Sequence, residues 1–405
     1  MQNYIIESEK KTPILSECEV LIAGGGIAGI AAAIAAARNG KKVTLLEREF
    51  TLGGMATLGL ITIYLPLCDG EGHQIIYGIG EELLMLSIKD GAEARYPTAW
   101  LDGDDINERR KNRFLVQFNP HLFALRAEEL LVSLGVTILY GTLACAVECK
   151  DEKITSVIVE NKSGRSAILV ESVIDCSGDA DICKLAGVKT ALHEGGNGLA
   201  SWYYYSTQGE VKLKMFGLAD VIPEKDSEAD EYDNVQQETL DENVRFSGVD
   251  AFELSDVVIK AHEIMFEDIM KEHSLSDDYV PVTISTIPLV RMSRRLVGEY
   301  TMDDTESHKY IEDSVGTFGD WRKRGPVYEL PFRTLYNADM KNLLVAGRDI
   351  SVTDAMWDIT RVIPVCAVTG EAAGTAASMC DDFTAIDISK LQEKLTAQNV
   401  KIHLD

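Results

Sequence analysis

The chain has 405 residues, 46% of them hydrophobic and 26% charged, which is ordinary for a soluble globular protein and favours two domains at this length. Its formal net charge of -26 opposes binding to nucleic acid and to anionic membranes, so a small molecule is the expected ligand. The sequence has no uncharged run of roughly 18 apolar residues and no signal peptide at its start. We therefore expect a cytoplasmic protein without a membrane span, with homo-oligomerisation left open.

Eight cysteines are spread over the chain without a CxxC pair and without the His and Cys spacing of a zinc site. We expect reduced thiols, mostly buried, and no metal centre. The missing CxxC pair also argues against a disulfide reductase.

The first regular unit extends from Val20 to Glu47 and has the pattern of a strand, a helix and a second strand. An apolar strand leads into Gly24-Gly25-Gly26-Ile27-Ala28-Gly29, an alanine-rich stretch continues to Gly40, and apolar residues then lead to Glu47. Glycines at this spacing, between a strand and a helix, are typical of a dinucleotide site. The alternative is a tight turn that binds nothing.

Each glycine of this fingerprint has a physical task. Gly24 permits a tight turn, Gly26 lets the backbone approach a pyrophosphate, and Gly29 lets the helix pack closely on the strand. The phosphates would lie at the helix N-terminus, where free N–H groups and the helix dipole favour an anion. Glu47, about 20 residues further on, can accept hydrogen bonds from the hydroxyls of an adenosine ribose.

A second glycine pair lies just past this unit, in Gly53-Gly54-Met55-Ala56-Thr57. Such small residues can bring the backbone close to another part of a large cofactor. Taken alone, the stretch is more often a simple loop.

The middle of the first half predicts a helix followed by extended segments. Asn119-Pro120 begins the helix, Gly135 ends it, and residues 136 to 140 predict a buried strand of a parallel sheet. Residues 172 to 176 return to the sheet and end in Ser177-Gly178, at the edge where such sheets bind ligands. Three short segments between these strands predict an inserted β-meander: 142–149, 153–160 and 166–170.

From about residue 196 to 330 the composition changes, which indicates a second domain. Trp202 to Tyr205 form an aromatic run that is more often core than a ligand site. Glu224 to Asn243 are strongly acidic and predict an exposed loop, and residues 255 to 271 predict an amphipathic helix. Residues 280 to 290 predict a strand.

The sheet resumes with residues 342 to 346 and ends at Gly347-Arg348-Asp349, after which Pro364 opens a helix that continues to about Met379. The fold class is therefore α/β, with a Rossmann-like domain built from separated segments and a mixed α+β capping domain. The first domain would comprise residues 14–65, 119–195 and 330–382, the capping domain 66–118 and 196–329, and a C-terminal helix or tail 383–405.

These blocks resemble the FAD-dependent oxidoreductases with the glutathione-reductase-type fold, in the branch of the succinate dehydrogenase and fumarate reductase flavoproteins. The resemblance rests on residues 20–47, 53–57, 173–179 and 342–377, and a fifth block, 291–300, is similar to one in a subset of uncharacterised bacterial members. It implies that FAD is bound by Gly24, Gly26, Ile27, Ala28, Gly29, Glu47, Arg48, Gly54, Met55, Ala56, Thr57, Ala144, Ser177, Gly178, Gly347, Arg348, Asp349, Val362 and Ile363.

One position departs from the family pattern, and the mode of flavin attachment is open. Many relatives have Gly-Asp where this chain has Gly347-Arg348-Asp349, so either Arg348 or Asp349 would contact the ribityl chain or the pyrophosphate. Cys68 and His73 lie near the second glycine pair, and they leave open whether the flavin is attached covalently.

The resemblance implies an oxidoreductase that accepts a hydride at flavin N5 from a small organic substrate. The alternatives are reduction of an activated double bond, as in fumarate reductases, and a flavin-binding electron carrier without turnover. The chain has only one glycine fingerprint, so NADH and NADPH are not expected as direct hydride donors.

Arg361 is a candidate catalytic residue because it precedes the helix that Pro364 opens. The charge of Arg361 and the free N–H groups of that helix would stabilise negative charge on the reduced flavin. The alternative is that Arg361 pairs with Asp354 or Asp358.

Arg291, Arg294 and Arg295 place three guanidinium groups within five residues of an acidic chain. One of them is expected to anchor the substrate, since a planar fork can hold a carboxylate. The resemblance ranks Arg294 and Arg295 ahead of Arg291. The alternative is that the arginines pair on the surface with nearby acids, namely Glu299, Asp303 and Asp304.

Overall fold

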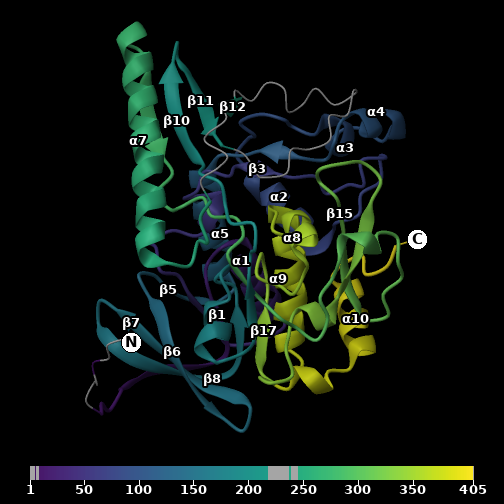
Figure 1. Cartoon of the computed structure of the whole chain (residues 1–405). Coiled ribbons are helices and arrows are strands. Elements are labelled where there is room, and N and C mark those ends of the chain that lie inside the picture. Colours follow the sequence, from purple (N-terminus) through teal and green to yellow (C-terminus); the bar gives the residue numbers. More distant parts are fainter. Residues whose placement is uncertain (1–4, 6–8, 218–236, 239–244, 405) are drawn as a thin grey trace.

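The computed structural model describes residues 5, 9–217, 237–238 and 245–404, and Figure 1 shows their elements in chain order. The predicted acidic loop, Glu224 to Asn243, lies outside the described residues apart from the short strand β12 (Gln237–Glu238). Among the described residues, no helix is both long and apolar enough to cross a bilayer. All eight cysteines are free thiols.

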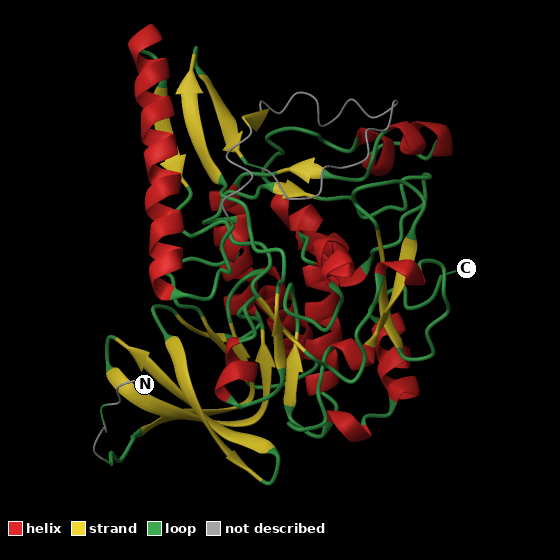
Figure 2. Ribbon diagram, in the orientation of Figure 1, coloured by secondary structure: helices red, strands yellow, loops and turns green. Residues whose placement is uncertain are grey.

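One seven-stranded sheet forms the Rossmann-like part of the molecule, in the lower half of Figure 2. Its strands follow the order β5-β2-β1-β8-β7-β6, with β17 also beside β8. The first four of these strands and β17 are parallel, whereas β8, β7 and β6 form an antiparallel meander. The bounds are β1 Ile14–Ala23, β2 Val43–Leu46, β5 Thr137–Leu139, β6 Leu143–Lys150, β7 Lys153–Asn161, β8 Gly164–Asp175 and β17 Leu343–Val345.

Two details of the predicted sheet are wrong. The segments 166–170 and 172–176 are not separate strands, because the chain continues without Gly or Pro between them and both belong to β8. One half of β8 pairs with β7 and the other with β17, while β1 pairs along both. The strand predicted as buried at 136–140 is β5, which lies at the sheet edge and is only partly buried.

Two helices rich in small residues pack against each other beside the sheet, α1 (Ile27–Arg38) and α9 (Ile363–Ala377). A Cβ atom at Gly370 or Gly374 would lie 2.3 Å from the carbonyl oxygen of Ala28 or Ala32, respectively. The backbones of α1 and α9 therefore touch, which explains why their facing residues are Gly and Ala. Other helices complete this layer: α2 Gly78–Ser87, α5 Pro120–Ser133 and α10 Ile388–Ala397.

The start of α5 confirms the predicted cap. The Asn119 side chain accepts hydrogen bonds from the backbone N–H groups of His121 and Leu122, at 3.1 and 3.0 Å. Pro120 occupies the first turn. Both features stabilise the helix start, since they satisfy or remove N–H groups that have no partner within the helix.

A second, smaller layer stands above the first and contains part of the segment from 196 to 330 whose composition changes (Figure 1). Other residues of that segment, such as Met292, Val315 and Phe318, pack in the core of the first layer. Its sheet follows the order β12-β11-β10-β13, and the long helix α7 packs against it. Most of the aromatic run is core, because Tyr203 and Tyr204 of β10 are buried. The bounds are β10 Ser201–Thr207, β11 Glu210–Phe216, α7 Ala251–Leu275 and β13 Val280–Ile284.

Short elements connect these layers. The strand predicted at 280–290 ends at Ile284, so a loop leads from β13 to β14 (Arg294–Leu296) and carries Arg291. The remaining elements are β3 Ile63–Tyr64, α3 Thr98–Leu101, α4 Ile106–Lys111, β4 Val116–Gln117, α6 Asp181–Leu185, β9 Thr190–Leu192, β15 Ser314–Gly319, β16 Val327–Pro331 and α8 Asp354–Thr360.

Candidate functional site

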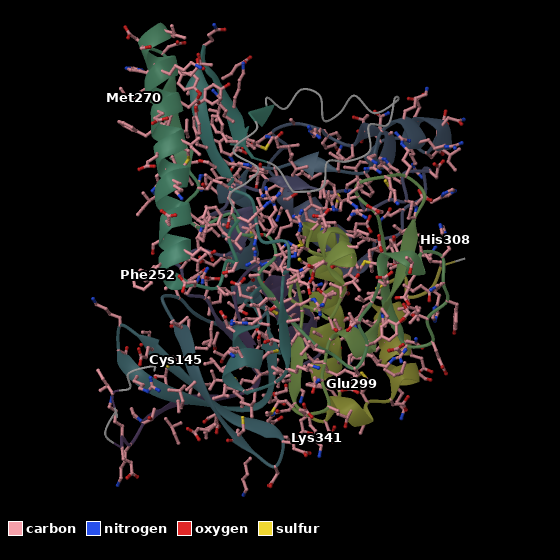
Figure 3. The ribbon with its side chains drawn as sticks, in the orientation of Figure 1. Cys145, Phe252, Met270, Glu299, His308 and Lys341 are labelled. Atoms are coloured by element: carbon pink, nitrogen blue, oxygen red, sulfur yellow. The ribbon has the colours of Figure 1, made fainter. Side chains whose placement is uncertain are left out.

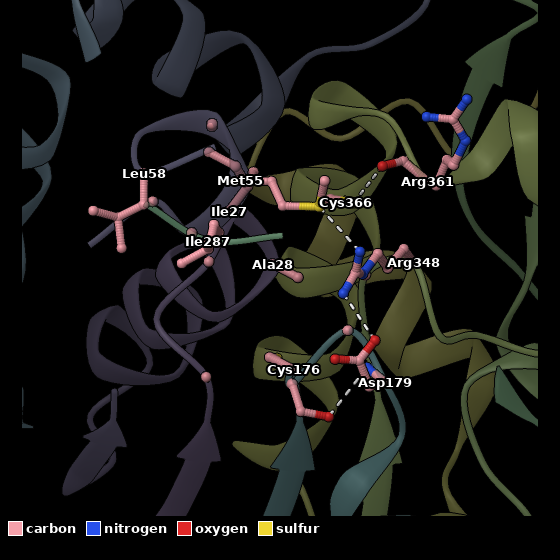
Figure 4. Close-up of a pocket in the computed structure, with 18 of the residues that line it drawn as sticks. Ile27, Ala28, Met55, Leu58, Cys176, Asp179, Ile287, Arg348, Arg361 and Cys366 are labelled. Carbon is pink, nitrogen blue, oxygen red and sulfur yellow. Dashed lines mark hydrogen bonds and ion pairs between the residues drawn. The ribbon is translucent and has the colours of Figure 1, made fainter. Parts of the chain in front are cut away.

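A cavity of about 360 Å³ lies at the carboxyl ends of β1, β8 and β17, and Figure 4 shows part of its lining. This is the sheet edge at which α/β proteins bind ligands. The residues predicted at the cofactor that line the cavity are Gly24, Gly26, Ile27, Ala28, Glu47, Arg48, Gly54, Met55, Ala56, Ala144, Ser177, Gly178, Gly347, Arg348, Val362 and Ile363. Five further predicted residues do not line it: Gly29, Thr57, Asp349, Arg294 and Arg295.

The three fingerprint glycines have different surroundings. Gly24 has a φ of +109°, and a Cβ atom there would lie 2.4 Å from the carbonyl oxygen of Cys176. A Cβ atom at Gly29 would lie 1.9 Å from the carbonyl oxygen of Gly24, whereas one at Gly26 would meet nothing within 4 Å. Gly24 and Gly29 therefore serve the turn and the packing, and Gly26 leaves space at the N-terminus of α1.

Glu47 stabilises the glycine loop through hydrogen bonds to the backbone. Its carboxylate accepts hydrogen bonds from the backbone N–H groups of Gly25 and Glu49, both at 2.8 Å. The side chain is buried, and this burial raises the pKa of Glu47. Glu47 thus shapes the loop as well as lining the cavity.

The second glycine pair forms a turn beside the first. The N–H group of Gly53 donates to the carbonyl oxygen of Gly25 at 2.8 Å, and Gly53 has a φ of +101°. Thr57 stabilises this turn, because its hydroxyl donates a hydrogen bond to the carbonyl oxygen of Leu52 at 2.6 Å. The two turns bring Gly54 and Met55 to the cavity wall beside Gly26.

Arg348 lies in the cavity wall and contacts residues of neighbouring segments, as Figure 4 shows. Its guanidinium donates to Asp179 Oδ1 at 2.9 Å and to the carbonyl oxygen of Val290, and it lies 3.0 Å from Met55 Sδ. Asp349 is instead fully buried behind the wall, where its Oδ2 accepts from the N–H group of Ala180 at 3.0 Å. Of the two alternatives, the side chain of Arg348 is therefore the one at the cavity.

Arg294 and Arg295 do not line the cavity and have partners within the protein. Arg294 donates to the carbonyl oxygen of Asp179 at 2.8 Å and pairs with Asp181 at 2.6 Å, so the expected pairing with Glu299, Asp303 or Asp304 is wrong for it. The guanidinium of Arg295 lies 5.7 Å from the centre of the Trp357 ring, where burial lowers its pKa.

Arg361 lines the cavity and also has the alternative ion pair. Its Nε donates to Asp358 Oδ1 at 2.9 Å, and Nη2 contacts the same oxygen. Asp354, the other candidate partner, instead lies 3.0 Å from His193 Nδ1. Arg361 directly precedes α9, whose N-cap residue Val362 offers no side-chain hydrogen bond to the first turn.

Another part of the cavity is lined mainly by apolar side chains together with Arg291. Arg291 lines it, with its guanidinium 5.8 Å from the centre of the Trp202 ring. Further apolar side chains from distant segments complete this part: Leu58, Met215, Leu254, Ile287 and Val290. The sequence ranked Arg291 last of the three arginines, because no local pattern indicates which of them reaches the cavity. Trp202 is buried in a hydrophobic cluster, as predicted for the aromatic run, and it lines the cavity as well.

One comparison with known proteins, against protein-family models, identifies the family. A family model described as FAD dependent oxidoreductase matches residues 19–395. No curated protein matches the sequence. Similar solved structures include a p-nitrophenol 4-monooxygenase from Pseudomonas putida (13% identity, 95% of this chain and 84% of that chain, TM-score 0.49) and a geranylgeranyl bacteriochlorophyll reductase-like protein from Thermoplasma acidophilum (15% identity, 95% and 84%, TM-score 0.46).

The cavity fits FAD in two respects. The open space at Gly26 lies at the start of a 12-residue helix with no side-chain cap, which suits a pyrophosphate. The second glycine pair brings the backbone close to the same cavity, as an extended cofactor requires. The chain belongs to the family of FAD-dependent oxidoreductases, and its cofactor is FAD.

Proposed function

We propose that the protein oxidises a small organic anion that Arg291 holds at the apolar end of the cavity. The observation that carries this proposal is the position of Arg291, a cation in the cavity wall beside Trp202. Bound FAD supplies the two-electron redox chemistry. The finer resemblance to succinate dehydrogenase and fumarate reductase flavoproteins favours a carboxylate as the anion.

Arg291 would act by binding and orientation. Its planar guanidinium can hold both oxygens of a carboxylate, and this bidentate contact fixes how the neighbouring C–H bond points. The contact would be strengthened by the apolar neighbours Met215, Leu254 and Ile287, which line the same cavity and exclude water. The face of Trp202 would hold the guanidinium in place.

Arg361 and the start of α9 would support the reaction by stabilising negative charge on the reduced cofactor. The first turn of α9 has no side-chain cap, and Val362 and Ile363 line the cavity. Free N–H groups there favour negative charge. Asp358 partly offsets the charge of Arg361, so we assign the larger share of this effect to the helix.

The reverse reaction, reduction of an activated double bond, would use the same anchor. A carrier without turnover would need no anchor for a small anion. The three functions therefore differ in what reduces or reoxidises the bound flavin.

The test is anaerobic absorbance spectroscopy of the FAD-loaded protein mixed with a panel of small carboxylic acids and their methyl esters. We expect bleaching by at least one acid and not by its ester, and a loss of about 100-fold in the second-order rate for Arg291→Met. Arg333→Met, which removes an arginine that pairs with Asp313, is the control and should react normally.

Three results would redirect the proposal. Reoxidation of dithionite-reduced protein by enoic acids, without bleaching by the saturated acids, would show the reverse reaction. A flavin that only a protein partner reduces would show a carrier. Loss of bleaching in Arg294→Lys or Arg295→Lys, with Arg291→Lys normal, would place the anchor at the residue that the resemblance favoured.

A further inference from the structure

Helix α7 has two opposite apolar faces, and only one of them is covered. Its inner face consists of Val257, Ala261, Met265 and Asp268, which are buried against the upper sheet. Its outer face carries four exposed apolar side chains: Phe252 (89% exposed), Ile259 (56%), Phe266 (66%) and Met270 (48%). Two residues, or about 200°, separate Ile259 from Ala261 and Phe266 from Asp268, so the two faces point in opposite directions.

The rotation of α7 about its axis is fixed from inside. Asp268 accepts hydrogen bonds from the Tyr203 hydroxyl and from Lys214 Nζ, the latter at 2.7 Å, and the hydroxyls of Tyr203 and Tyr279 lie 2.6 Å apart. These groups are buried, so turning the helix would break several buried hydrogen bonds. The outer stripe therefore cannot turn inward.

The outer stripe lies along the edge of the molecule. Figure 3 shows Phe252 near one end of α7 and Met270 near the other, both on the side away from the rest of the chain. Their spacing of seven, seven and four residues keeps the apolar side chains in one row. Such a row is a contact surface for another helix.

We propose that this stripe is the interface of a homodimer in which the α7 helices of two copies pair in antiparallel orientation. The charges beside the stripe carry this choice. One flank contains Asp256, Lys260, Glu263, Glu267 and Lys271, whereas the other contains Ser255, His262 and His273 and no residue with a full charge. In an antiparallel pair of identical helices, like flanks face each other.

One register of the antiparallel pair sets opposite charges of the charged flank against each other. Lys260 would face Glu267 of the partner subunit, and Asp256 would face Lys271 of the partner subunit. Both pairs have their midpoint between residues 263 and 264, and the twofold axis repeats each of them. A parallel pair would instead place the charged flank against the uncharged one.

The same register also pairs the apolar side chains. It sets Phe266 level with residue 261 of the partner subunit, next to the partner's Ile259, so aromatic and aliphatic groups alternate. Within one subunit, Lys260 Nζ lies 2.7 Å from Asp256 and 5.6 Å from the centre of the Phe246 ring. Val280 and Val282 on the edge strand β13 are also exposed.

Analytical ultracentrifugation of the FAD-loaded full chain tests the interface. We expect a dimer that dissociates on dilution, and a dissociation constant raised about 100-fold or more by Phe266→Glu. Leu125→Glu is the matched control, because Leu125 on α5 is equally exposed (63%) and lies outside the stripe. Flavin absorbance shows that each variant keeps its fold.

Charge reversal tests the register. Lys260→Glu and Glu267→Lys should each raise the dissociation constant about tenfold, because each places like charges opposite each other. The double variant Lys260→Glu with Glu267→Lys should restore it to within a few-fold. A protein that stays monomeric at all concentrations, a dimer insensitive to Phe266→Glu, or a double variant no better than the singles would overturn the proposal.

Discussion

The two ends of the cavity are built in different ways. At the cofactor end, backbone from regular elements makes the wall: the glycine turns follow β1 and β2, and a Cβ atom at Gly29 has no room. At the other end, where we propose that the substrate binds, side chains make the wall: Arg291 comes from the loop between β13 and β14, Trp202 from β10 and Leu254 from α7. The cofactor end therefore depends on the path of the main chain, whereas the proposed substrate end depends on side chains that come from segments far apart in the sequence.

This difference predicts which substitutions harm folding and which harm binding alone. At the cofactor end, the cost of adding a single methyl group depends on where the new Cβ atom points. At the proposed substrate end, we expect a change of the Arg291 side chain to have little effect on the fold, because Arg291 lies on a loop between two strands.

The largest effect is expected for Gly29→Ala. The new Cβ atom would lie 1.9 Å from the carbonyl oxygen of Gly24, and backbone cannot move aside cheaply, so we expect a loss of about 3 kcal/mol in the free energy of unfolding. Gly26→Ala is the matched control and should lose less than about 1 kcal/mol. Urea denaturation of both variants measures this, and equal losses would contradict the assigned roles.

Glu47→Ala should weaken FAD binding by about 2 to 3 kcal/mol, because it removes the acceptor of two backbone N–H groups and a partner for the ribose. The neighbouring Glu49→Ala should change it little, since that side chain is half exposed. Fluorescence titration of the apoprotein with FAD measures both. Similar affinities for the two variants would remove Glu47 from the site.

Glu371 makes the scaffold behind the cofactor end sensitive to pH. It is buried in α9, where burial raises its pKa to about 8. Because the folded state then holds a proton that the unfolded state has lost, stability falls as the pH rises from about 5 to 8. Near this carboxyl group are the N–H group of Ile79, at 2.8 Å, and the charges of Arg38 and Glu82.

Glu371→Gln should remove this dependence, because the amide oxygen can still accept from Ile79. We expect a gain of about 1 to 2 kcal/mol at pH 8 and almost none at pH 5. Thermal denaturation at the two pH values measures it. A variant less stable than the parent at pH 8 would show that the carboxylate itself is needed.

The smallest effect is expected at Arg361. Because Asp358 already pairs with it, Arg361→Met should lower the flavin midpoint potential by less than about 30 mV. Asp358→Asn should shift the potential in the opposite direction, since it leaves the guanidinium charge uncompensated. Dye-linked redox titration measures both, and no shift in either variant would separate this pair from the flavin.

Local patterns predicted the elements that carry the cofactor end. Three predictions rested on sequence patterns only a few residues long, and the structure confirms them. They are the strand, glycine turn and helix after Val20, the cap at Asn119 and the helix opened by Pro364. Amphipathic periodicity likewise predicted α7. These are elements whose geometry is set by neighbours in sequence.

The substrate end could not be predicted in the same way. Arg291 and Arg294 are three residues apart, yet one lines the cavity and the other pairs with Asp181, because the loop leaving β13 turns before β14 begins. The outcome depends on where Asp179 and Asp181 lie, more than 100 residues away in the chain. No periodicity in residues 280 to 295 contains that information.

The most direct test of this division is to measure two affinities in the same two variants, Gly26→Ala and Arg291→Met. One is the affinity of the apoprotein for FAD, and the other is the concentration dependence of flavin bleaching by the reactive acid. We predict that Gly26→Ala weakens FAD binding at least tenfold while the reconstituted protein bleaches normally, and that Arg291→Met leaves FAD binding within twofold but raises the half-saturating acid concentration at least tenfold. Weaker FAD binding in Arg291→Met, to the extent seen in Gly26→Ala, would contradict the account.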